Sequence, residues 1–571
     1  MLTKGLSVHG SIAYDSYYYS RKKYSKTFPY YLARRDAEDP DYIYLIPQSE
    51  ESIWSVSTGW DKNRKVYMEF GIDYNRTFGL HKTTALILYN QSKYYSPSLQ
   101  YYVPNAYQGL VGRLTYEYAS RYLAEFNMGY NGTENFAKGK RFGFFPAVSL
   151  GWVISEEKFF PKNNIVKYLK VRGSYGEVGN DQIGGDRFLY LPSSYGAASD
   201  SGVNKYNFGL ASNPYTSLMI VENKIGNPDL TWEKAKKMNV GVDINLFNNC
   251  LTASFDIFKE KRNNILANRS TSPMIIGANL PAYNFGEMEN RGWEMDLNFR
   301  HHIQDFHYWA RFNYSFARNE IIYMDEVQKR YDYQMTTGRR KNQFFGLIFD
   351  GYYNSWEEIN ALDRPKSSWS GNQLQPGDVK YIDVNQDGVI DDYDMVPIGY
   401  TPVPEIIYGF SFGAQYKGFD FSILFQGADN VSIKYFGRSM WPFAKGEESA
   451  KSLIKERWTQ ERYEAGEKIT FPRLSLNPNG ETDHNYRPST LWIRDASYLR
   501  LKNLEVGYTF TGGFVKRLNL NSVRLYFNGS NLFTWTDVVD LDPEAPSRSG
   551  NVEINTYPLQ KVYNIGLNIN F

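Results

Sequence analysis

The carboxy-terminal stretch 561–571 alternates between apolar and polar side chains. Its apolar groups belong to Tyr563, Ile565, Leu567, Ile569 and Phe571, and asparagines stand between several of them. Successive side chains of a β-strand point to opposite faces, so this spacing predicts a strand with one apolar and one polar face. Such strands, repeated through a chain that ends on an aromatic residue, are typical of a transmembrane β-barrel with a water-filled lumen.

Paired runs of the same pattern recur along the chain and predict antiparallel hairpins. Clear pairs lie at 238–257, 293–316 and 408–425. In total there are about sixteen runs, each close to the roughly ten residues that a tilted strand needs to cross a bilayer. Long segments interrupt them at 21–64, 178–234, 262–290, 319–404, 429–496 and 534–560. Short turns on one side and long extracellular loops on the other predict an all-β, antiparallel outer-membrane barrel.

Composition agrees with a barrel and excludes other classes. Aromatic residues make up 17% of the chain, with 48 Tyr, as expected for aromatic girdles at two membrane interfaces. The mean hydropathy of -0.53, and the lack of an apolar run of about 18 residues, exclude helical membrane spans. The formal net charge of +2 gives no global electrostatic reason to expect nucleic-acid binding. A single cysteine, Cys250, excludes an internal disulfide.

Short motifs spread over the chain carry a resemblance to a known family. They are Phe142–Trp152, Leu169–Gly176, Asn227–Glu233, Asn290–Glu294, Gly377–Tyr381, Tyr498–Asn503 and Tyr557–Leu559. In order and content these motifs resemble the SusC/RagA-type TonB-linked outer-membrane transporters. The resemblance is collinear and covers essentially the whole chain.

The resemblance implies that residues 1–571 are part of a TonB-dependent-receptor β-barrel domain. Members of the family have about 22 strands, so about six strands, a plug domain, a TonB box and a signal peptide are expected to precede this chain. The amino-terminal residues show no signal-peptide pattern, in agreement with this expectation. The resemblance further implies a place in the outer membrane, in contact with its lipid. The implied partners are a SusD-like surface lipoprotein over the long loops, and TonB, which acts through the plug.

From these features we expect active import of a bulky nutrient, either an oligosaccharide or a peptide, with an oligosaccharide favoured. Three alternatives stay open. A passive porin is one, because about sixteen strands can close a channel on their own. A barrel fragment without a function of its own is another. An outer-membrane enzyme has the least support, since the sequence contains no H-E-x-x-H motif and no evident catalytic cluster.

The sharpest chemical motif is the acidic segment 383–394. It follows the pattern of a Ca²⁺-binding loop, with Gly388 at the sharp turn. The expected ligands are Asp383, Asn385, Asp387, the backbone carbonyl of Val389, Asp391 and Asp394. The last position is Asp instead of the usual Glu, and no flanking helices are predicted, so a solvated acidic turn is the alternative. We expect a structural role for the ion, because the loop lies far from any nucleophile.

Other features have plainer interpretations. Gly338–Lys341 is a basic run that we interpret as a solvated surface, with contact to lipopolysaccharide or an anionic substrate as the alternative. The spacing of apolar residues over 447–462 predicts a helix packed under its own loop. Packing within the loops is favoured over stacking on sugars for four tryptophans: Trp356, Trp369, Trp441 and Trp492.

Overall fold

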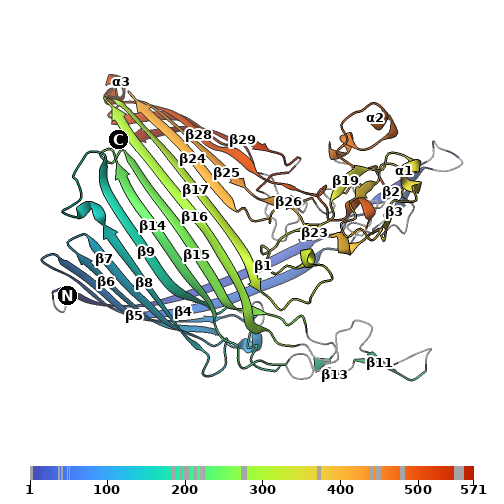
Figure 1. Ribbon diagram of the computed structural model, residues 1–571, viewed down its shortest axis with the longest axis horizontal. Helices are drawn as coiled ribbons and strands as arrows, with labels where there is room; N and C mark the ends of the chain where they lie inside the picture. The colour runs from blue at the N-terminus through green and yellow to red at the C-terminus, as the bar shows by residue number, and fades with distance from the viewer. Residues whose placement is uncertain are drawn as a thin grey trace.

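The computed structural model shows one large curved sheet with loop structure gathered at one end (Figure 1). It describes residues 4–571 except 36–38, 40, 42, 48, 51, 183–186, 193–195, 198–204, 211–214, 219, 222–224, 272–279, 370–373, 436–440, 444–451, 476–482, 540 and 545–558. The sheet has 16 strands, and neighbouring strands are antiparallel throughout. The predicted fold class and strand number are therefore confirmed.

Neighbours in the sheet follow one another along the chain. In this order the strands are β1 (Leu6–Ser25), β4 (Ser55–Phe78), β5 (His81–Tyr95), β6 (Asn105–Tyr118), β7 (Tyr122–Thr133), β8 (Phe142–Val153), β9 (Val166–Asn180), β14 (Glu233–Leu246), β15 (Leu251–Ala267), β16 (Tyr283–Ile303), β17 (Phe306–Tyr323), β24 (Ile406–Tyr416), β25 (Phe419–Asp429), β28 (Tyr498–Phe510), β29 (Ser522–Thr536) and β30 (Val562–Asn570). A chain that runs up and down in this way needs only hairpin connections.

Short strands lie in the loops and pair with one another outside the large sheet. They form the pairs β2 (Tyr31–Arg35) with β3 (Ile43–Pro47), β10 (Gly196–Ala197) with β13 (Ile220–Val221), β11 (Lys205–Phe208) with β12 (Tyr215–Leu218), β18 (Phe345–Gly346) with β23 (Val396–Pro397), β19 (Phe349–Tyr352) with β21 (Val379–Tyr381), β20 (Lys366–Ser367) with β22 (Val389–Ile390), and β26 (Ser432–Lys434) with β27 (Ile493–Asp495). Of these pairs, β20 with β22 is parallel.

In the middle of the last hairpin, the register places apolar side chains opposite apolar ones and polar side chains opposite polar ones. Between β29 and β30, Leu567 stands opposite Leu525 and Asn564 stands opposite Asn528. The two asparagines are hydrogen-bonded, with Asn564 Nδ2 donating to Asn528 Oδ1 over 2.9 Å. The alternation predicted for the last strand is thus confirmed. One face of the sheet is suited to lipid and the other to a water-filled lumen.

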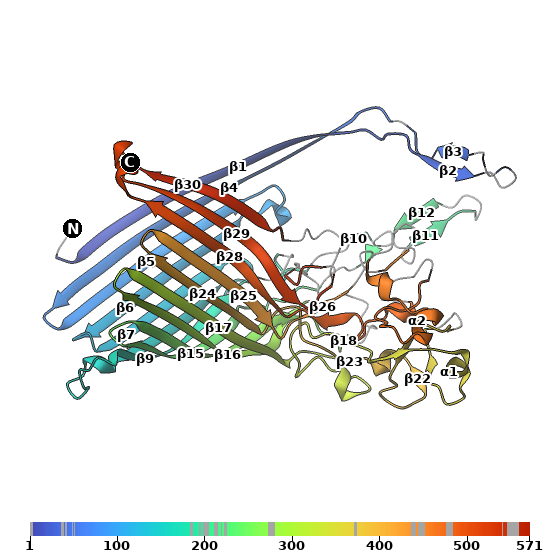
Figure 2. The ribbon, with the colours of Figure 1, turned by 90° about the horizontal axis from the view of Figure 1, so that it is seen from above.

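Strands β1 and β30 form the two edges of the sheet. Each pairs with a single neighbour, and within the described residues no ladder joins β1 to β30. Nearly all their residues are exposed. Figure 2 shows β1 and β4 extending well beyond the other strands at the loop end. In a bilayer the unpaired backbone groups of such edges are costly, because no water is available to bind them.

At the end of the sheet that holds both termini, five of the seven connections are turns of two to four residues, and the connections longer than 12 residues all lie at the other end. The predicted turns at 119–121, 247–250 and 416–418 are all present. Two of the long segments are much shorter than predicted. The strands β1 and β4 continue to Ser25 and from Ser55, and β15 and β16 continue to Ala267 and from Tyr283. Outside the membrane both faces of a strand can be polar, so an alternation of apolar and polar residues no longer identifies these parts of the strands.

Loops from distant parts of the chain fold into one unit, which we call the extracellular body: the described residues of 324–405, 430–497 and 537–544. Figure 2 shows α1, α2, β18, β22 and β23 together at the loop end of the sheet. The buried core of this unit comprises Leu347, Tyr352, Val379, Tyr381, Ile390, Val431, Ile433, Tyr435, Trp458, Phe471, Tyr486, Leu491, Trp492, Ala496 and Val538. All three segments contribute to this core, so the loops stabilise one another.

The helices are short. They are α1 (Trp356–Asn360), α2 (Gln460–Glu464) and α3 (Gly513–Arg517), with 3-10 turns at Gln100–Tyr102, Ile154–Glu156, Asp332–Gln334, Asp392–Asp394, Ser452–Glu456 and His484–Tyr486. The predicted helix over 447–462 is wrong in extent. Residues 447–451 lie outside the described residues, and the rest of this range forms a 3-10 turn followed by α2. The two elements are separate because Thr459 between them has an extended backbone, and its side chain caps the start of α2. In the described part of the chain, no helix has the length and apolar character needed to cross a membrane.

Candidate functional site

A network of charges on the polar face joins β9, β14 and β15. The guanidinium of Arg172 contacts Asp243 (Nε to Oδ2, 3.1 Å) and Asp256 (Nη1 to Oδ1, 2.7 Å). Gly241 lies between Arg172 and Asp256 in the register, and a Cβ there would lie 2.5 Å from Asp256 Oδ1 and 2.7 Å from Arg172 Cζ. The missing side chain therefore allows an arginine and an aspartate two strands apart to meet.

A second network, near the short turns, has the same construction. Arg524 of β29 donates to Asp420 of β25 (Nε to Oδ1, 2.8 Å) and to Glu505 of β28 (Nη2 to Oε1, 2.6 Å). Gly507 stands opposite Asp420, where a Cβ would lie 2.5 Å from the carboxylate and 2.7 Å from the guanidinium. Both networks keep the lumenal wall polar while pairing its charges. A wall of this kind can guide a hydrated molecule without binding it tightly.

One serine of the wall lies in a sequence that matches the nucleophile motif G-x-S-x-G. Ser411 is in the middle of β24, opposite Arg311 and Leu424 in the two ladders. A nucleophile elbow instead requires a sharp turn between a strand and a helix. Ser411 is therefore an ordinary wall residue.

Inside the extracellular body, Asp378 is a buried polar centre. It is 3% exposed and forms an ion pair with Arg473 (Oδ1 to Nε, 2.6 Å). The amide of Asn485 donates to the same oxygen over 2.8 Å. Gly377 precedes it with φ +93°, and a Cβ at this position would lie 2.5 Å from Trp458. The motif Gly377–Tyr381 thus combines a backbone conformation that favours glycine with a carboxylate that joins the segments 324–405 and 430–497.

His484 lies beside this centre and is held by two hydrogen-bond partners. Its Nε2 is 2.8 Å from the carbonyl oxygen of Val379, and its Nδ1 is 3.0 Å from Ser367 Oγ. A carbonyl oxygen only accepts, so Nε2 carries the proton and Nδ1 of the neutral ring accepts from the hydroxyl. Burial lowers the pKa of His484, which favours this neutral form. His484 therefore supports the loops and is not positioned as an exposed acid or base.

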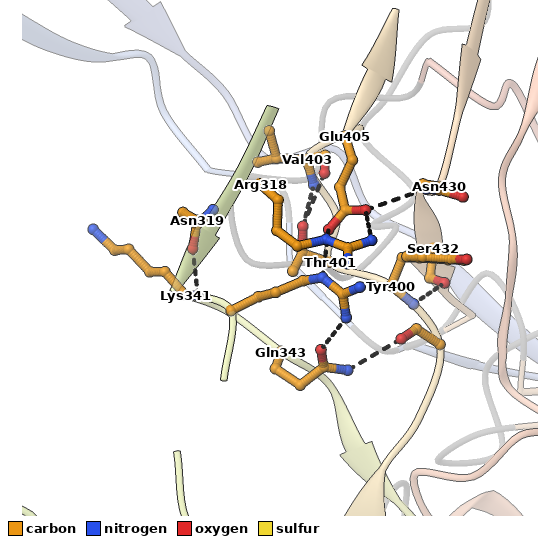
Figure 3. A network of polar contacts seen from close by, with 12 residues as sticks. Arg318, Asn319, Lys341, Gln343, Tyr400, Thr401, Val403, Glu405, Asn430 and Ser432 are labelled. Atoms are coloured by element: carbon orange, nitrogen blue, oxygen red, sulfur yellow. Dashed lines mark hydrogen bonds and ion pairs between the residues drawn. The ribbon is translucent and has the colours of Figure 1, made fainter. Parts of the chain in front are cut away.

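Glu405 anchors the start of β24 through two arginines, and Figure 3 shows one of them, Arg318, beside it. Its side chain is 4% exposed and accepts from Arg318 (Oε2 to Nη2, 2.8 Å) and from Arg340. Asn430 donates to the same carboxylate over 3.2 Å. Burial by itself raises the pKa of Glu405, but the two guanidinium groups outweigh it and hold the pKa below its ordinary value.

The basic run Gly338–Lys341 is therefore only partly the solvated surface that the sequence predicted. Arg340 is committed to Glu405, and its guanidinium also lies 5.2 Å from the ring centre of Tyr400. The backbone of the run pairs with Ile321, where Gly338 N donates to the carbonyl of Ile321 over 2.8 Å. In Figure 3 the side chain of Lys341 points away from this network.

The acidic segment 383–394 folds as a compact loop in which most carboxylates accept backbone N–H groups. Gly388 has φ +82° and donates to Asp383 Oδ2 over 2.8 Å, as expected for the sharp turn. Asp394 is fully buried and accepts from the N–H groups of Val384 and Asp391, each over 2.8 Å. Burial raises the pKa of Asp394, and the charge of Asp383 raises it further.

One oxygen in this loop is left without a partner. Asp383 Oδ1 is buried and has no hydrogen-bond partner among the described residues. Such an oxygen fits the hard-ligand chemistry of Ca²⁺, and a cation would relieve the repulsion between Asp383 and Asp394. Across the described residues, however, no group of three or more His, Cys, Asp or Glu side chains is already assembled around a common point. Occupancy would therefore require the side chains of this loop to rearrange.

Most of the loop tryptophans hold the extracellular body together. Trp492 is 2% exposed in the core, and Trp369 and Trp441 pack against that core. Arg487 also stacks on Trp369, with its guanidinium 4.1 Å from the ring centre. Trp356 in α1 differs, because it is 54% exposed. Of the four, Trp356 alone presents its ring to solvent.

Sequence reasoning did not single out the residues that organise the loops: Asp378, Glu405, His484 and Arg500. Each has a partner more than 30 positions away in sequence, so even the motifs Gly377–Tyr381 and Tyr498–Asn503, which contain Asp378 and Arg500, do not show what these side chains contact. A buried carboxylate beside arginines is recognisable only once the loops are placed together.

Comparison with known proteins gives a consistent result. The family model described as "TonB dependent receptor-like, beta-barrel" matches residues 3–532. TonB-dependent receptor P3 of Formosa agariphila is 28% identical over 479 residues, which cover 81% of this chain and 45% of that protein. TonB-dependent receptor SusC of Bacteroides thetaiotaomicron is 28% identical over 477 residues, covering 82% of this chain and 44% of SusC. The chain thus spans about half the length of the curated relatives it matches.

Solved structures show the same fold. The chain superimposes on the structure described as the RagAB peptide transporter with a TM-score of 0.72. The match covers 100% of this chain and 60% of the RagAB chain, at 21% sequence identity. At this identity the likeness concerns the fold alone.

Proposed function

We propose, from the premise that this chain belongs to the TonB dependent receptor-like β-barrel family, that it serves in TonB-dependent import of a bulky polar nutrient. Members of this family are outer-membrane receptors and not enzymes. The main support for this proposal is that the sheet has one apolar face and one polar face. Its apolar face suits the bilayer, and its other face holds the Arg172 and Arg524 networks, which suit a hydrated cargo.

The cargo class that we propose is an oligosaccharide. Sugars are neutral, hydrated and bulky, which suits a wall whose charges are already paired with one another. The exposed ring of Trp356 adds a surface of the kind that stacks on sugar rings. A peptide is the competing cargo, because RagAB, whose fold is similar, is described as a peptide transporter.

We further propose that the extracellular body is the docking platform for a SusD-like surface lipoprotein. A shared core with fully buried residues such as Leu347 and Val379 gives this unit a defined shape. A surface that is already ordered loses little conformational entropy when a partner binds. TonB would act through the part of the protein that carries the plug.

Uptake assays with the full-length transporter test this function. Cells that express it with its lipoprotein should accumulate labelled oligosaccharide, and deletion of tonB or a protonophore should abolish the uptake, because energised import needs both. Uptake that survives both treatments would instead indicate a passive porin. Energised uptake of labelled peptides but not of oligosaccharides would correct the cargo class and leave the transport function in place.

We also propose that the loop from Asp383 to Asp394 binds a structural Ca²⁺ ion. The ligands would be Asp383, Asn385, Asp387, the carbonyl of Val389, Asp391 and Asp394. The ion would neutralise the loop's carboxylates and hold its position in the extracellular body. The buried, unpartnered Asp383 Oδ1 supports this proposal.

Removal of two ligands, Asp383→Ala with Asp387→Ala, is expected to abolish Ca²⁺ binding and make residues 383–394 sensitive to protease. A chelator should have the same effect on the unmodified protein, because both remove the ion that holds the loop. Calorimetry with Ca²⁺ at about 1 mM covers the weak end of protein affinities. Asp392→Ala is the matched control, since Asp392 lies outside the ligand pattern and its side chain is 75% exposed. No binding by the unmodified protein would identify the segment as an acidic turn.

A further inference from the structure

A row of basic residues crosses the outward face of the sheet just beyond the apolar band. The registers align Lys259, Arg291 and Arg318 across β15, β16 and β17. Two residues closer to the membrane, the same face carries Trp293 opposite Phe316. Side chains two positions apart on a strand share a face, so the basic row lies directly above these aromatic rings. This is the level at which the phosphates of membrane lipids meet a barrel.

Within the described residues, two arginines at this level are not committed to a carboxylate. Lys259 is paired with Glu289 (Nζ to Oε2, 2.9 Å), and Arg318 is paired with Glu405. The side chains of Arg291 and Arg339 have no such hydrogen bond or ion pair, and Arg291 is exposed. Their charges are therefore available to a ligand.

These arginines share a groove of about 410 Å³. Arg291, Arg318, Arg339 and Arg340 line it, together with a single carboxylate, Glu320. Glu405 binds Arg318, which lies beside it in Figure 3, and it also binds Arg340, so it fixes the positions of both side chains. Arg318 also lies above the Phe316 ring, 5.5 Å from its centre, which links the groove to the apolar band. Four guanidinium groups against two carboxylates leave the site positively charged.

We propose that this groove binds the phosphate of a glycolipid in the outer leaflet, with the acyl chains packed along the apolar face below. The planar guanidinium fork matches two phosphate oxygens, which favours arginine over lysine at phosphate sites. Arg318 and Arg340 are held in place by Glu405 and form the floor, while Arg291 and Arg339 supply the uncommitted charges. By the register, Arg291, Arg318 and Glu320 lie on the outward face of their strands, and for this reason we assign the groove to a lipid and not to the transported cargo.

Lipid retention by the full-length transporter in mild detergent tests the proposal. The probes are phosphorylated lipid A, the same lipid A after phosphatase treatment, and inorganic phosphate, and binding is measured by native mass spectrometry. We expect the unmodified protein to retain phosphorylated lipid A. Arg291→Gln with Arg339→Gln should weaken lipid retention by about tenfold or more, because the loss of a single charge-assisted hydrogen bond to the phosphate is enough to lower the affinity about tenfold.

Three further variants test whether the loss of lipid is specific to the groove. Arg311→Gln is the matched control, because Arg311 lies on β17 but on the opposite face, next to Trp309, and should retain lipid as the unmodified protein does. Arg291→Lys with Arg339→Lys keeps the charge and should recover part of the binding. If the double glutamine variant does not assemble, Arg339→Gln alone, in a loop outside the sheet strands, should show a smaller loss in the same direction.

Three results would overturn the proposal. Undiminished retention by the assembled glutamine variants would show that these arginines do not hold the lipid. Equal binding of dephosphorylated lipid A would show that phosphate is not recognised. Binding of inorganic phosphate as tight as that of the lipid would assign the groove to a free anion.

Discussion

Leu567→Arg in the full-length protein is expected to abolish assembly in the outer membrane. Leu567 lies near the middle of β30, is 57% exposed and stands opposite Leu525 on the apolar face. A charge on the lipid side near the bilayer centre costs about 2 to 4 kcal/mol. Loss of the heat-modifiable folded band in outer-membrane fractions is the measurement.

Asn564→Arg is the control for this experiment. Asn564 belongs to the same strand but stands on the polar face, opposite Asn528, where a charged side chain reaches water. It is a better control than Asn568, whose partner Arg524 would bring two guanidinium groups together. Equal amounts of the two variants in the outer membrane would mean that the lipid and lumenal faces are assigned the wrong way round.

Arg500→Met is expected to detach residues 537–544 from the extracellular body. The side chain of Arg500 is 2% exposed and contacts Asp542 (Nη2 to Oδ1, 2.8 Å) and Glu544. It also donates to Thr534 Oγ1 over 2.9 Å. Methionine keeps much of the volume but leaves two carboxylates without their cation, and breaking a buried ion pair in this way costs about 3 to 5 kcal/mol. Faster protease cleavage and faster hydrogen exchange in residues 537–544 are the measurements.

Lys502→Met is the matched control, because Lys502 lies two residues further along β28 and approaches the same carboxylate. Its Nζ is 3.8 Å from Glu544 Oε2, and its side chain is 29% exposed. A pair of this kind contributes about 0 to 1 kcal/mol, so cleavage should hardly change. If both variants behave alike, the segment is held by something other than the buried arginine.

The strands of the sheet were predictable because the bilayer imposes a simple rule on them. One face must be apolar, so apolar residues return at every second position, and all 16 strands carry enough of this signal to be found. This alternation is not required in the parts of the strands that extend beyond the membrane. For this reason the outer parts of β1, β4, β15 and β16 were assigned to loops.

The extracellular body was predicted poorly, and its contacts explain why. The spacing of apolar residues in 447–462 is typical of a helix. In the structure, however, Trp458 is buried because it packs beside Gly377 in a core shared with distant loops, and not because it lies on the apolar face of a helix. Arg340 appeared as part of a solvated basic run, although Glu405, 65 positions away in sequence, pairs with it. Loop residues are placed by partners that local patterns do not contain. The Ca²⁺ loop stays a prediction.

The sequence by itself determined the class of the protein, the number of strands, the two faces of the sheet and the side on which the long loops lie. Each depends on side chains one or two positions apart, and a β-strand turns that spacing directly into geometry. Tertiary structure alone decided which charges are paired. Arg172 reaches Asp256 only because Gly241 lies between them, and Arg291 stays uncommitted while Arg318, its neighbour across the ladder, is bound to Glu405. Such pairings depend on distances between side chains that are brought together only when strands and loops pack.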